Sequence, residues 1–238
     1  MICTHMHSKS GSDRSRLLLT FQGEQSTLTA SGQKFVTCEG RNALARLSIL
    51  HVAYPGSKFN DGDIFVDIYV KPQEPVVDYL TRFSGITADH LNPDSKHGKT
   101  NTIVDTRTAY LHLRALIDQG CVFIGHGLAK DFQVLNLQVS PHQIIDTVML
   151  YHLPRRRWIS LRFLVNYLFQ RDMQREVHDS VEDARAALEL FRLAERLNSK
   201  GNDVKPVQNQ RGEERTEEFE HLLTEIYQYG KQVDWKVA

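Results

Sequence analysis

A short apolar run at residues 121–124 limits the folds open to this chain more than any other segment. It has no polar alternation, which is typical of a strand buried on both faces. The run follows a predicted helix, which ends at Gly120. After the run come Gly125-His126-Gly127, and a new helix is predicted to begin near Leu128. A buried strand between two helices predicts an α/β fold in which helices cover both faces of a sheet.

Segments on either side extend this pattern. Residues 43–50 alternate, with Ala43, Ala45, Leu47 and Ile49 expected on one face. Residues 64–70 are rich in β-branched and aromatic side chains. The turn-rich segment between them predicts a hairpin with a long loop. Residues 144–147 read as another short buried strand. Antiparallel strands followed by alternating strands and helices predict a mixed sheet flanked by helices.

The 238 residues are enough for one good-sized domain, and 41% hydrophobic with 24% charged residues is the composition of a soluble globular protein. Residues 1–16 are polar and lack periodicity, so we expect a disordered tail there and a single domain over residues 17–238. Within that domain, the polar and charge-rich residues 198–216 predict a flexible excursion.

Charge and cysteine usage exclude several classes of protein. Lys plus Arg and Asp plus Glu both number 29, so any attraction to nucleic acid must be local rather than general. The three cysteines form no CxxC pair, which indicates a reducing compartment and no disulfide framework. No apolar run approaches the ~20 residues of a membrane span, and no signal core is present. We expect a cytoplasmic or nuclear protein without a membrane partner.

The stretch His178-Asp179-Ser180 opens a helix that continues beyond Asp183. Ser180 followed three residues later by Asp183 predicts a capping box, so the helix should start at about Ser180. His178 and Asp183 can then face one point in front of the helix N-terminus, where the dipole favours an ionised carboxylate and a neutral imidazole can act as a general base. Taken alone, this stretch favours the simpler interpretation, in which Asp183 only caps the helix and His178 is an ordinary loop histidine.

A second acidic position follows the run at residues 121–124. Asp131 lies in the first turns of the next helix, and ligands of α/β sheets bind beyond the carboxyl ends of such strands. Asp131 can therefore point to that edge, although a solvent-facing aspartate near a helix start is an equally good interpretation. His126, between two glycines, can face the same edge or make a structural hydrogen bond.

Several segments together resemble the DEDDh 3′-5′ exonucleases and, within that superfamily, the catalytic nuclease domains of poly(A)-nuclease deadenylation complexes. The segments that carry the resemblance are residues 76–86, 125–132, 144–147, 151–154, 159–164, 178–188 and 219–231. The resemblance runs from about Glu24 to Lys236. The joint order and spacing of these motifs make it specific, since a single His-x4-Asp motif is weak.

The resemblance implies a ribonuclease H-like mixed sheet and poly(A) shortening, in which the 3′-terminal phosphodiester of RNA is hydrolysed and AMP is released. In this family four carboxylates hold two Mg²⁺ ions. It also implies that Asp131 and Asp183 bind metal, that His178 activates the attacking water, and that the Ser84-Gly85-Ile86 turn lies near the terminal nucleotide. The implied partners are single-stranded RNA, the poly(A) tail and the regulatory subunit of the poly(A)-nuclease complex.

One motif of the family is missing. Asp-x-Glu-Phe on the first strand should fall at Leu18-Leu19-Thr20-Phe21, where only the phenylalanine matches, and the nearest acids are Glu24 and Glu39. We therefore expect a truncated or replaced first strand, an incomplete Mg²⁺ site and impaired hydrolysis. A truncated or mis-spliced product and a degenerate paralogue would each explain this departure.

Two other functional hypotheses stay open. One is a catalytically dead RNA-binding or interaction fragment with the same fold, and the other is a DEDDh nuclease with a different single-stranded substrate.

The basic cluster Arg155-Arg156-Arg157-Trp158 could hold RNA phosphates and stack a base. For Trp158 we favour packing on the core, and we leave the role of the arginines open.

Overall fold

The structure is a computed structural model, and it describes residues 2–5, 12–22, 25–28, 34–38, 41–54, 56–173, 179–198 and 215–235. Side chains are described from residue 43 onward within these ranges, residues 82 and 83 excepted. The elements follow in this order: β1 (Ile2–His5), β2 (Ser12–Gln22), β3 (Gln25–Leu28), β4 (Lys34–Cys38), β5 (Arg41–Val52), β6 (Ile64–Lys71), α1 (Thr81–Ser84), η1 (Ala88–Leu91), β7 (Ile103–Asp105), α2 (Thr106–Asp118), β8 (Cys121–Gly125), α3 (Leu128–Val134), η2 (Pro141–Gln143), β9 (Ile144–Asp146), α4 (Thr147–Leu150), α5 (Leu161–Phe169), α6 (Ser180–Asn198) and α7 (Glu217–Gln232).

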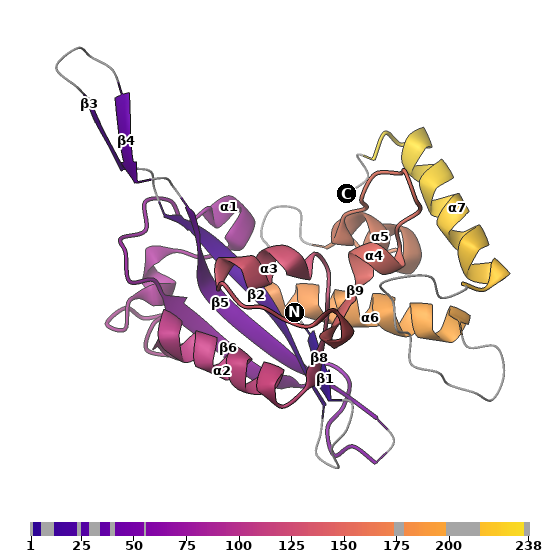
Figure 1. The fold of residues 1–238 in the computed structure, drawn as a ribbon, viewed down its shortest axis with the longest axis horizontal. Helices are drawn as coiled ribbons and strands as arrows, with labels where there is room; N and C mark the ends of the chain where they lie inside the picture. The colour runs from indigo at the N-terminus through magenta and orange to yellow at the C-terminus, as the bar shows by residue number, and fades with distance from the viewer. Residues whose placement is uncertain are drawn as a thin grey trace.

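The strands form two mixed sheets and a separate two-stranded hairpin, and helices flank the mixed sheets (Figure 1). One mixed sheet has the order β2-β5-β6-β7, the other has the order β1-β8-β9, and the hairpin consists of β3 and β4; β2 contacts β8 where the two mixed sheets meet. The pairs β2–β5, β5–β6 and β1–β8 are antiparallel, whereas β6–β7 and β8–β9 are parallel. This arrangement confirms the predicted mixed sheet flanked by helices.

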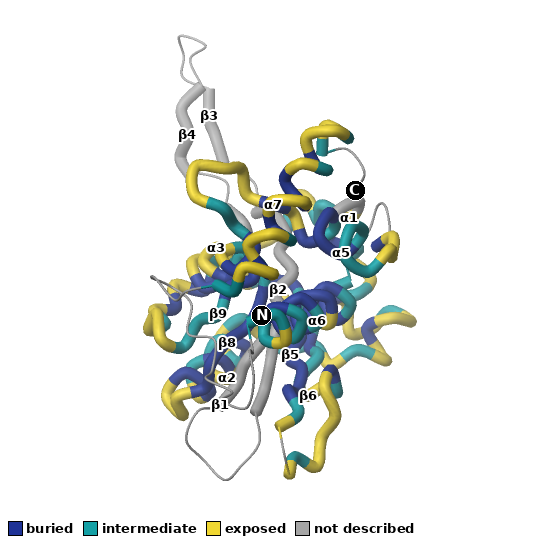
Figure 2. The backbone as a smooth tube through the Cα atoms, turned by 90° about the vertical axis from the view of Figure 1, so that its right-hand side faces the viewer, coloured by how far each residue is buried: buried dark blue, intermediate teal, exposed yellow. Residues whose placement is uncertain are grey.

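Strand β8 is buried over its whole length, as its apolar sequence predicts. Phe123 belongs to a core that the sheet shares with α2 and α3, whereas its neighbour Ile124 belongs to a second core with α4, α5, α6 and α7. Successive side chains of a strand point to opposite faces, so β8 contributes to both cores. Figure 2 shows buried segments running through β5 and α6 at the centre of the molecule.

The hairpin of β5 and β6 is confirmed, and Leu47 and Ile49 lie in the same core as predicted, but the expected place of Ala45 on that face is wrong. The register to β2 shifts so that Leu18 pairs with Arg46 and Leu19 pairs with Leu44, which leaves Ala45 as an extra residue. A bulge of this kind reverses the alternation of side chains along a strand. Ala45 accordingly packs with Ile86, away from the core that contains Leu47.

Part of the segment expected as a disordered tail is in strands. Strand β1 pairs with β8, and β2 begins at Ser12 and pairs with β5 along its length, because these backbones find hydrogen-bonding partners in the sheet. The remainder of residues 1–16 lies outside the described residues, as do residues 199–214 of the predicted excursion at 198–216. The assignment of residues 17–238 to one domain stays a prediction.

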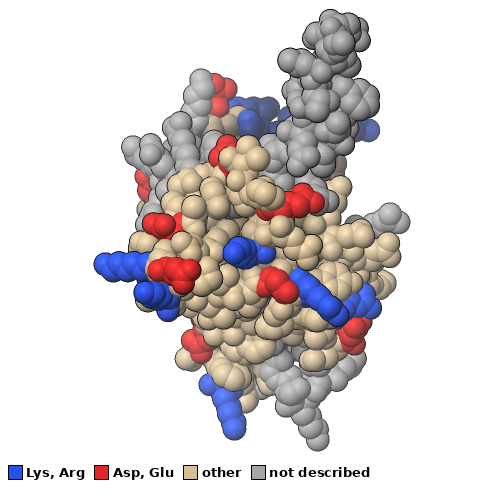
Figure 3. Space-filling model, turned by 90° about the vertical axis from the view of Figure 1, so that its left-hand side faces the viewer, with Lys and Arg blue, Asp and Glu red and all other residues tan. Residues whose placement is uncertain are grey.

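The surface carries charges of both signs. Figure 3 shows Lys and Arg side chains interspersed with Asp and Glu side chains over one face, in agreement with a formal net charge of zero. Among the helices in the described part of the chain, none combines the length and apolar character that crossing a bilayer requires.

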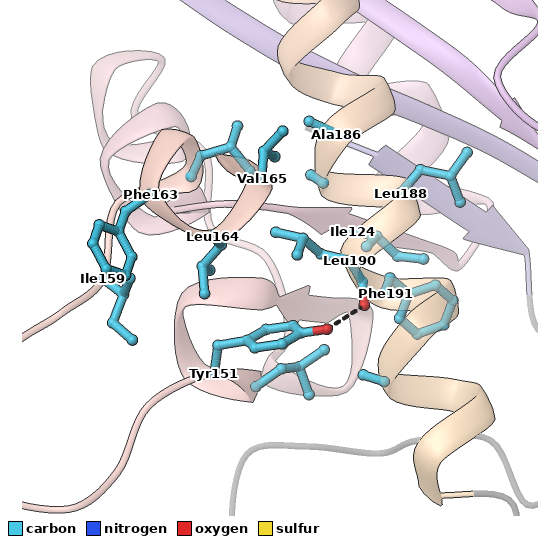
Figure 4. Close-up of a cluster of buried hydrophobic side chains, with 14 of the residues drawn as sticks. Ile124, Tyr151, Ile159, Phe163, Leu164, Val165, Ala186, Leu188, Leu190 and Phe191 are labelled. Atoms are coloured by element: carbon cyan, nitrogen blue, oxygen red, sulfur yellow. Dashed lines mark hydrogen bonds between the residues drawn. The ribbon is translucent and has the colours of Figure 1, made fainter. Parts of the chain in front are cut away.

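The hydroxyl of Tyr151 makes a hydrogen bond inside the core that contains α4, α5, α6 and α7. Tyr151 is 1% exposed, and its hydroxyl donates a hydrogen bond to the carbonyl oxygen of Leu190 in α6 at 2.9 Å (Figure 4). Tyr151→Phe should lower the free energy of unfolding by about 1 kcal/mol, because the buried carbonyl loses its partner. Urea unfolding followed by circular dichroism measures this change.

The matched control is Tyr54→Phe, at a residue that is 40% exposed. It should change the free energy of unfolding by less than about 0.5 kcal/mol. Equal stability of the Tyr151→Phe variant and the unsubstituted chain would contradict the assignment of this hydrogen bond to the core.

Candidate functional site

The backbone that follows β8 is held by hydrogen bonds to the side chain of Asp146. Gly127 has φ 83°, in the left-handed region that favours glycine, and it is the N-cap of α3. Asp146, at the end of β9, accepts hydrogen bonds from the backbone N–H groups of Gly127 at 2.8 Å and Leu128 at 2.9 Å. The same side chain accepts a hydrogen bond from Val148 N–H at 3.0 Å. Asp146 therefore fixes the starts of both α3 and α4.

His126 has a structural role in this turn. Its Nε2 donates to the carbonyl oxygen of Ile159 at 3.1 Å, and its Nδ1 lies 2.9 Å from the hydroxyl of Thr147. These contacts confirm the structural interpretation of His126 and tie the turn to the segment before α5. Asp131 lies one turn into α3 and is partly exposed.

Helix α6 begins at Ser180, as predicted, but the predicted capping box is wrong. The side chain of Asp179 accepts hydrogen bonds from Val181 N–H at 2.9 Å and Glu182 N–H at 3.0 Å, so Asp179 caps the helix. The hydroxyl of Ser180 bonds across to β5 instead. The acidic residue directly before the helix outcompetes the serine because its position suits the N-cap and its charge suits the helix dipole.

A network around Arg46 joins this helix start to the sheet. The guanidinium of Arg46 contacts both carboxylate oxygens of Asp67 on β6 at 2.8 Å and reaches Asp179 at 2.8 Å. The hydroxyl of Ser48 donates to Asp67 at 2.8 Å and lies 2.6 Å from the hydroxyl of Ser180. Sequence patterns did not predict this network, although a charged residue inside each of two apolar strands, Arg46 and Asp67, is a usable signal.

These contacts move the pKa values of the partners in opposite directions. Burial lowers the pKa of Arg46, but the hydrogen bonds and charges of Asp67 and Asp179 outweigh it, so the pKa is raised. Burial raises the pKa of Asp179, but the Glu182 N–H bond and Arg46 together reverse that effect and leave the pKa below its usual value. Both groups are therefore held in their charged forms.

The Ser84-Gly85-Ile86 turn packs against the bulge in β5. The hydroxyl of Ser84 donates to the carbonyl oxygen of Tyr79 at 2.7 Å and accepts a hydrogen bond from Ile86 N–H at 3.0 Å. Ile86 is 2% exposed and packs with Ala45. Ser84 and Ile86 therefore shape the turn from within, and the role of this turn in substrate binding stays a prediction.

The structure brings several predicted segments into contact with β5. Helices α3 and α6, which carry Asp131 and Asp183, both contact β5, and α6 also contacts β2 (Figure 1). In the backbone register, Leu18 pairs with Arg46, so the strand expected to carry the family's first motif lies directly beside the Arg46 network. Asp183 is 1% exposed. His178 lies outside the described residues, and the roles of His178, Asp131 and Asp183 stay predictions.

The two carboxylates that the resemblance assigns to helices α3 and α6 do not by themselves fit a site for two Mg²⁺ ions. Such a site needs several carboxylates, because Mg²⁺ binds oxygen ligands and two dications require matching negative charge. Asp131 and Asp183 supply two carboxylates, while Leu18 and Thr20 supply none. Among the residues that the structure describes, no group of three or more His, Cys, Asp or Glu side chains is placed to hold a metal ion.

The mixed sheet, the helix starts that carry Asp131 and Asp183, and the strand order define the class of ribonuclease H-like nucleases. The family model described as Exonuclease (RNase_T) matches residues 48–191, which is more than half of the chain. The chain therefore belongs to the Exonuclease (RNase_T) family.

Curated relatives make this placement more specific. The chain is 40% identical over 221 residues to the PAN2-PAN3 deadenylation complex catalytic subunit PAN2 of Homo sapiens, a match that covers 92% of this chain and 17% of that protein. It is 39% identical over 219 residues to the protein of the same description in Cryptococcus neoformans, with 92% and 17% covered. The chain thus spans about a sixth of the length of the curated relatives it matches.

Solved structures support the same family placement. The apo Pan2 pseudoubiquitin hydrolase-RNA exonuclease module of Saccharomyces cerevisiae matches with a TM-score of 0.74 and 32% identity, over 98% of this chain and 33% of that chain. The same module in complex with A7 RNA matches with a TM-score of 0.71 and 31% identity, over 98% and 34%. These matches confirm the predicted resemblance and the ribonuclease H-like fold.

The Arg46 network predicts a measurable stability difference. Arg46→Ala should lower the free energy of unfolding by roughly 2–3 kcal/mol, because two part-buried carboxylates lose hydrogen bonds to a charged partner. Arg114→Ala is the control, since Arg114 pairs with Asp118 on the surface of α2 with side chains 44% and 55% exposed. The control should cost less than about 0.5 kcal/mol. Equal losses in the two variants, measured by urea unfolding, would count against the network.

Asp179 should contribute to the pH dependence of stability. Its pKa in the folded state lies below the unfolded value of about 3.9, so its contribution is complete above that value and is lost as the pH falls through the folded pKa. Asp179→Asn keeps a good N-cap but removes the charge. The stability gap between the unsubstituted chain and this variant should be constant from about pH 5 to 7 and should narrow below about pH 4. A gap that does not change with pH in urea titrations would refute the assigned role of the charge.

Proposed function

We propose that this chain is a 3′-5′ exoribonuclease of the poly(A)-shortening type, which removes AMP from the 3′ end of A-rich RNA, with hydrolysis impaired by an incomplete Mg²⁺ site. The observation that carries the proposal is membership of the Exonuclease family, taken together with the uncharged Leu18 and Thr20 where the resemblance places the first-motif carboxylates. The acidic helix starts at Asp131 and Asp183 support the nuclease assignment. Leu18 and Thr20 support the impairment.

The partners in this proposal follow from the relatives. Proteins similar to this chain are described as the catalytic subunit of the PAN2-PAN3 complex, and a similar module has been solved with A7 RNA. We therefore include single-stranded RNA, the poly(A) tail and the regulatory subunit of that complex among the partners. A cytoplasmic or nuclear location belongs to the same proposal, and Cys121, a buried free thiol, is compatible with it.

A catalytically dead RNA-binding or interaction fragment is the competing function. The specific observation in its favour is that two positions of a four-carboxylate motif are uncharged in this chain. The two hypotheses differ in whether the protein retains any metal-dependent hydrolysis. They agree on RNA as a ligand only where the fragment is an RNA-binding one.

Introducing carboxylates at residues 18 and 20 distinguishes the impaired nuclease from the fragment without catalysis. The chain, an Asp183→Ala control and a Leu18→Asp/Thr20→Glu variant are incubated with end-labelled A-tailed RNA and Mg²⁺, and the products are resolved on a sequencing gel. We expect slow shortening by the unsubstituted chain and none by Asp183→Ala. The double variant should shorten RNA roughly a hundredfold faster or more, because a properly held metal ion stabilises the transition state by several kcal/mol.

Each alternative outcome has a definite meaning. Efficient shortening by the unsubstituted chain, abolished in Asp183→Ala, would refute the impairment. A folded double variant that still fails to shorten RNA, confirmed by its circular dichroism spectrum, would favour the fragment without catalysis. Equal shortening of other homopolymers would replace poly(A) by a broader single-stranded substrate.

A further inference from the structure

The loop between α4 and α5 concentrates positive charge on a chain whose formal net charge is zero (Figure 1). Arg155, Arg156 and Arg157 are consecutive and exposed, and Trp158 follows them. Among the ion pairs of the described side chains, none involves Arg155 or Arg156. Two guanidinium groups on this loop therefore remain available to an external anion. We call residues 152–160 the basic loop.

The backbone of the basic loop is held firmly. The hydroxyl of Tyr227, on α7, accepts a hydrogen bond from Leu153 N–H at 3.3 Å and donates one to the carbonyl oxygen of Arg157 at 2.8 Å. The ring of His152 donates from Nε2 to the carbonyl oxygen of Arg156 at 3.0 Å. A loop fixed from both sides presents its side chains with little further loss of conformational entropy on binding.

Trp158 does not pack on the core, which corrects the sequence-based expectation. Its side chain is 54% exposed, and its ring stacks on His152 with centroids 3.8 Å apart and an interplanar angle of 26°. The next residue, Ile159, is buried instead, at 4% exposure. An exposed indole supported from behind by another ring is a platform on which a nucleobase can stack.

The basic loop adjoins the candidate functional site. Ile159, which follows Trp158, accepts the hydrogen bond from His126 Nε2 at 3.1 Å. His126 directly precedes Gly127, the N-cap of the helix that carries Asp131. An RNA strand whose 3′ end lies at that helix start can therefore continue over the basic loop.

The geometry points to the basic loop as a binding site for single-stranded RNA, in which Arg155 and Arg156 contact phosphates and Trp158 stacks a base upstream of the 3′ end. This inference rests on the proposed function for the identity of the ligand, but it does not require hydrolysis. RNA supplies phosphates that can bind the arginine side chains, and it supplies a base that can stack on the exposed indole. An acidic peptide would engage the arginines without using the stacking platform.

Binding measurements without catalysis test the inference. Fluorescence anisotropy of labelled A-tailed RNA is measured in EDTA at several salt concentrations with the full chain. Trp158→Ala should weaken binding roughly tenfold with an unchanged salt dependence, and Trp158→Phe should restore most of the affinity. Arg155→Gln/Arg156→Gln should weaken binding and reduce the slope of log affinity against log salt by about 1.4, since each phosphate contact on a single strand contributes about 0.7.

The control is Arg107→Gln/Arg114→Gln on α2, which removes the same charge from a different surface and should leave both affinity and slope nearly unchanged. All variants should keep the thermal unfolding midpoint, because the substituted side chains are exposed. RNA binding that is indifferent to the loop variants, or lowered equally by the α2 control, would overturn the inference while leaving the proposed function intact.

Two further outcomes would also overturn it. The first is the absence of RNA binding by the unsubstituted chain, in which case the shortening assay judges the proposed function separately. The second is competition by polyglutamate as strong as competition by unlabelled RNA, together with no effect of Trp158→Ala. That result would identify a surface for acidic peptides.

Discussion

The contact of Arg46 with two carboxylates joins elements that are far apart in the sequence. The planar guanidinium matches the carboxylate of Asp67 bidentately and keeps a further N–H for Asp179, an arrangement that a lysine could not reproduce. Because Asp179 also caps α6, the place where this helix starts depends on strand β5. The position of Asp183, one turn into the helix, then follows from the sheet rather than from the loop before the helix.

The candidate site is divided between helices and a strand, and the two parts differ in what they retain. The helix starts keep Asp131 and Asp183, whereas Leu18 and Thr20 on β2 carry no charge. The backbone of β2 pairs with β5 beside Arg46, so the strand itself is present. Under the proposed function, the chain keeps the fold of the family and lacks the two carboxylates that its first strand would supply.

Local patterns in the sequence predicted the elements but not the contacts between them. The apolar run of β8 was sufficient to predict a buried strand, and the periodicity of α6 was sufficient to predict a helix. Burial on both faces and helical spacing are properties of single segments. The cap at Asp179 was mistaken for one at Ser180, since the partner that engages the Ser180 hydroxyl is Ser48, more than a hundred residues away. The bulge at Ala45 and the exposure of Trp158 also depend on neighbours in space. Sequence spacing alone cannot reveal either of them.

Binding and hydrolysis depend on different parts of this molecule. The basic loop is held by Tyr227 on α7 and by His126 beside α3, and none of these contacts involves β2. The proposed metal site, by contrast, would take two of its carboxylates from β2. Under the proposed function, hydrolysis and RNA binding therefore depend on separate elements. A substitution confined to β2 would change hydrolysis and leave RNA binding by the basic loop in place.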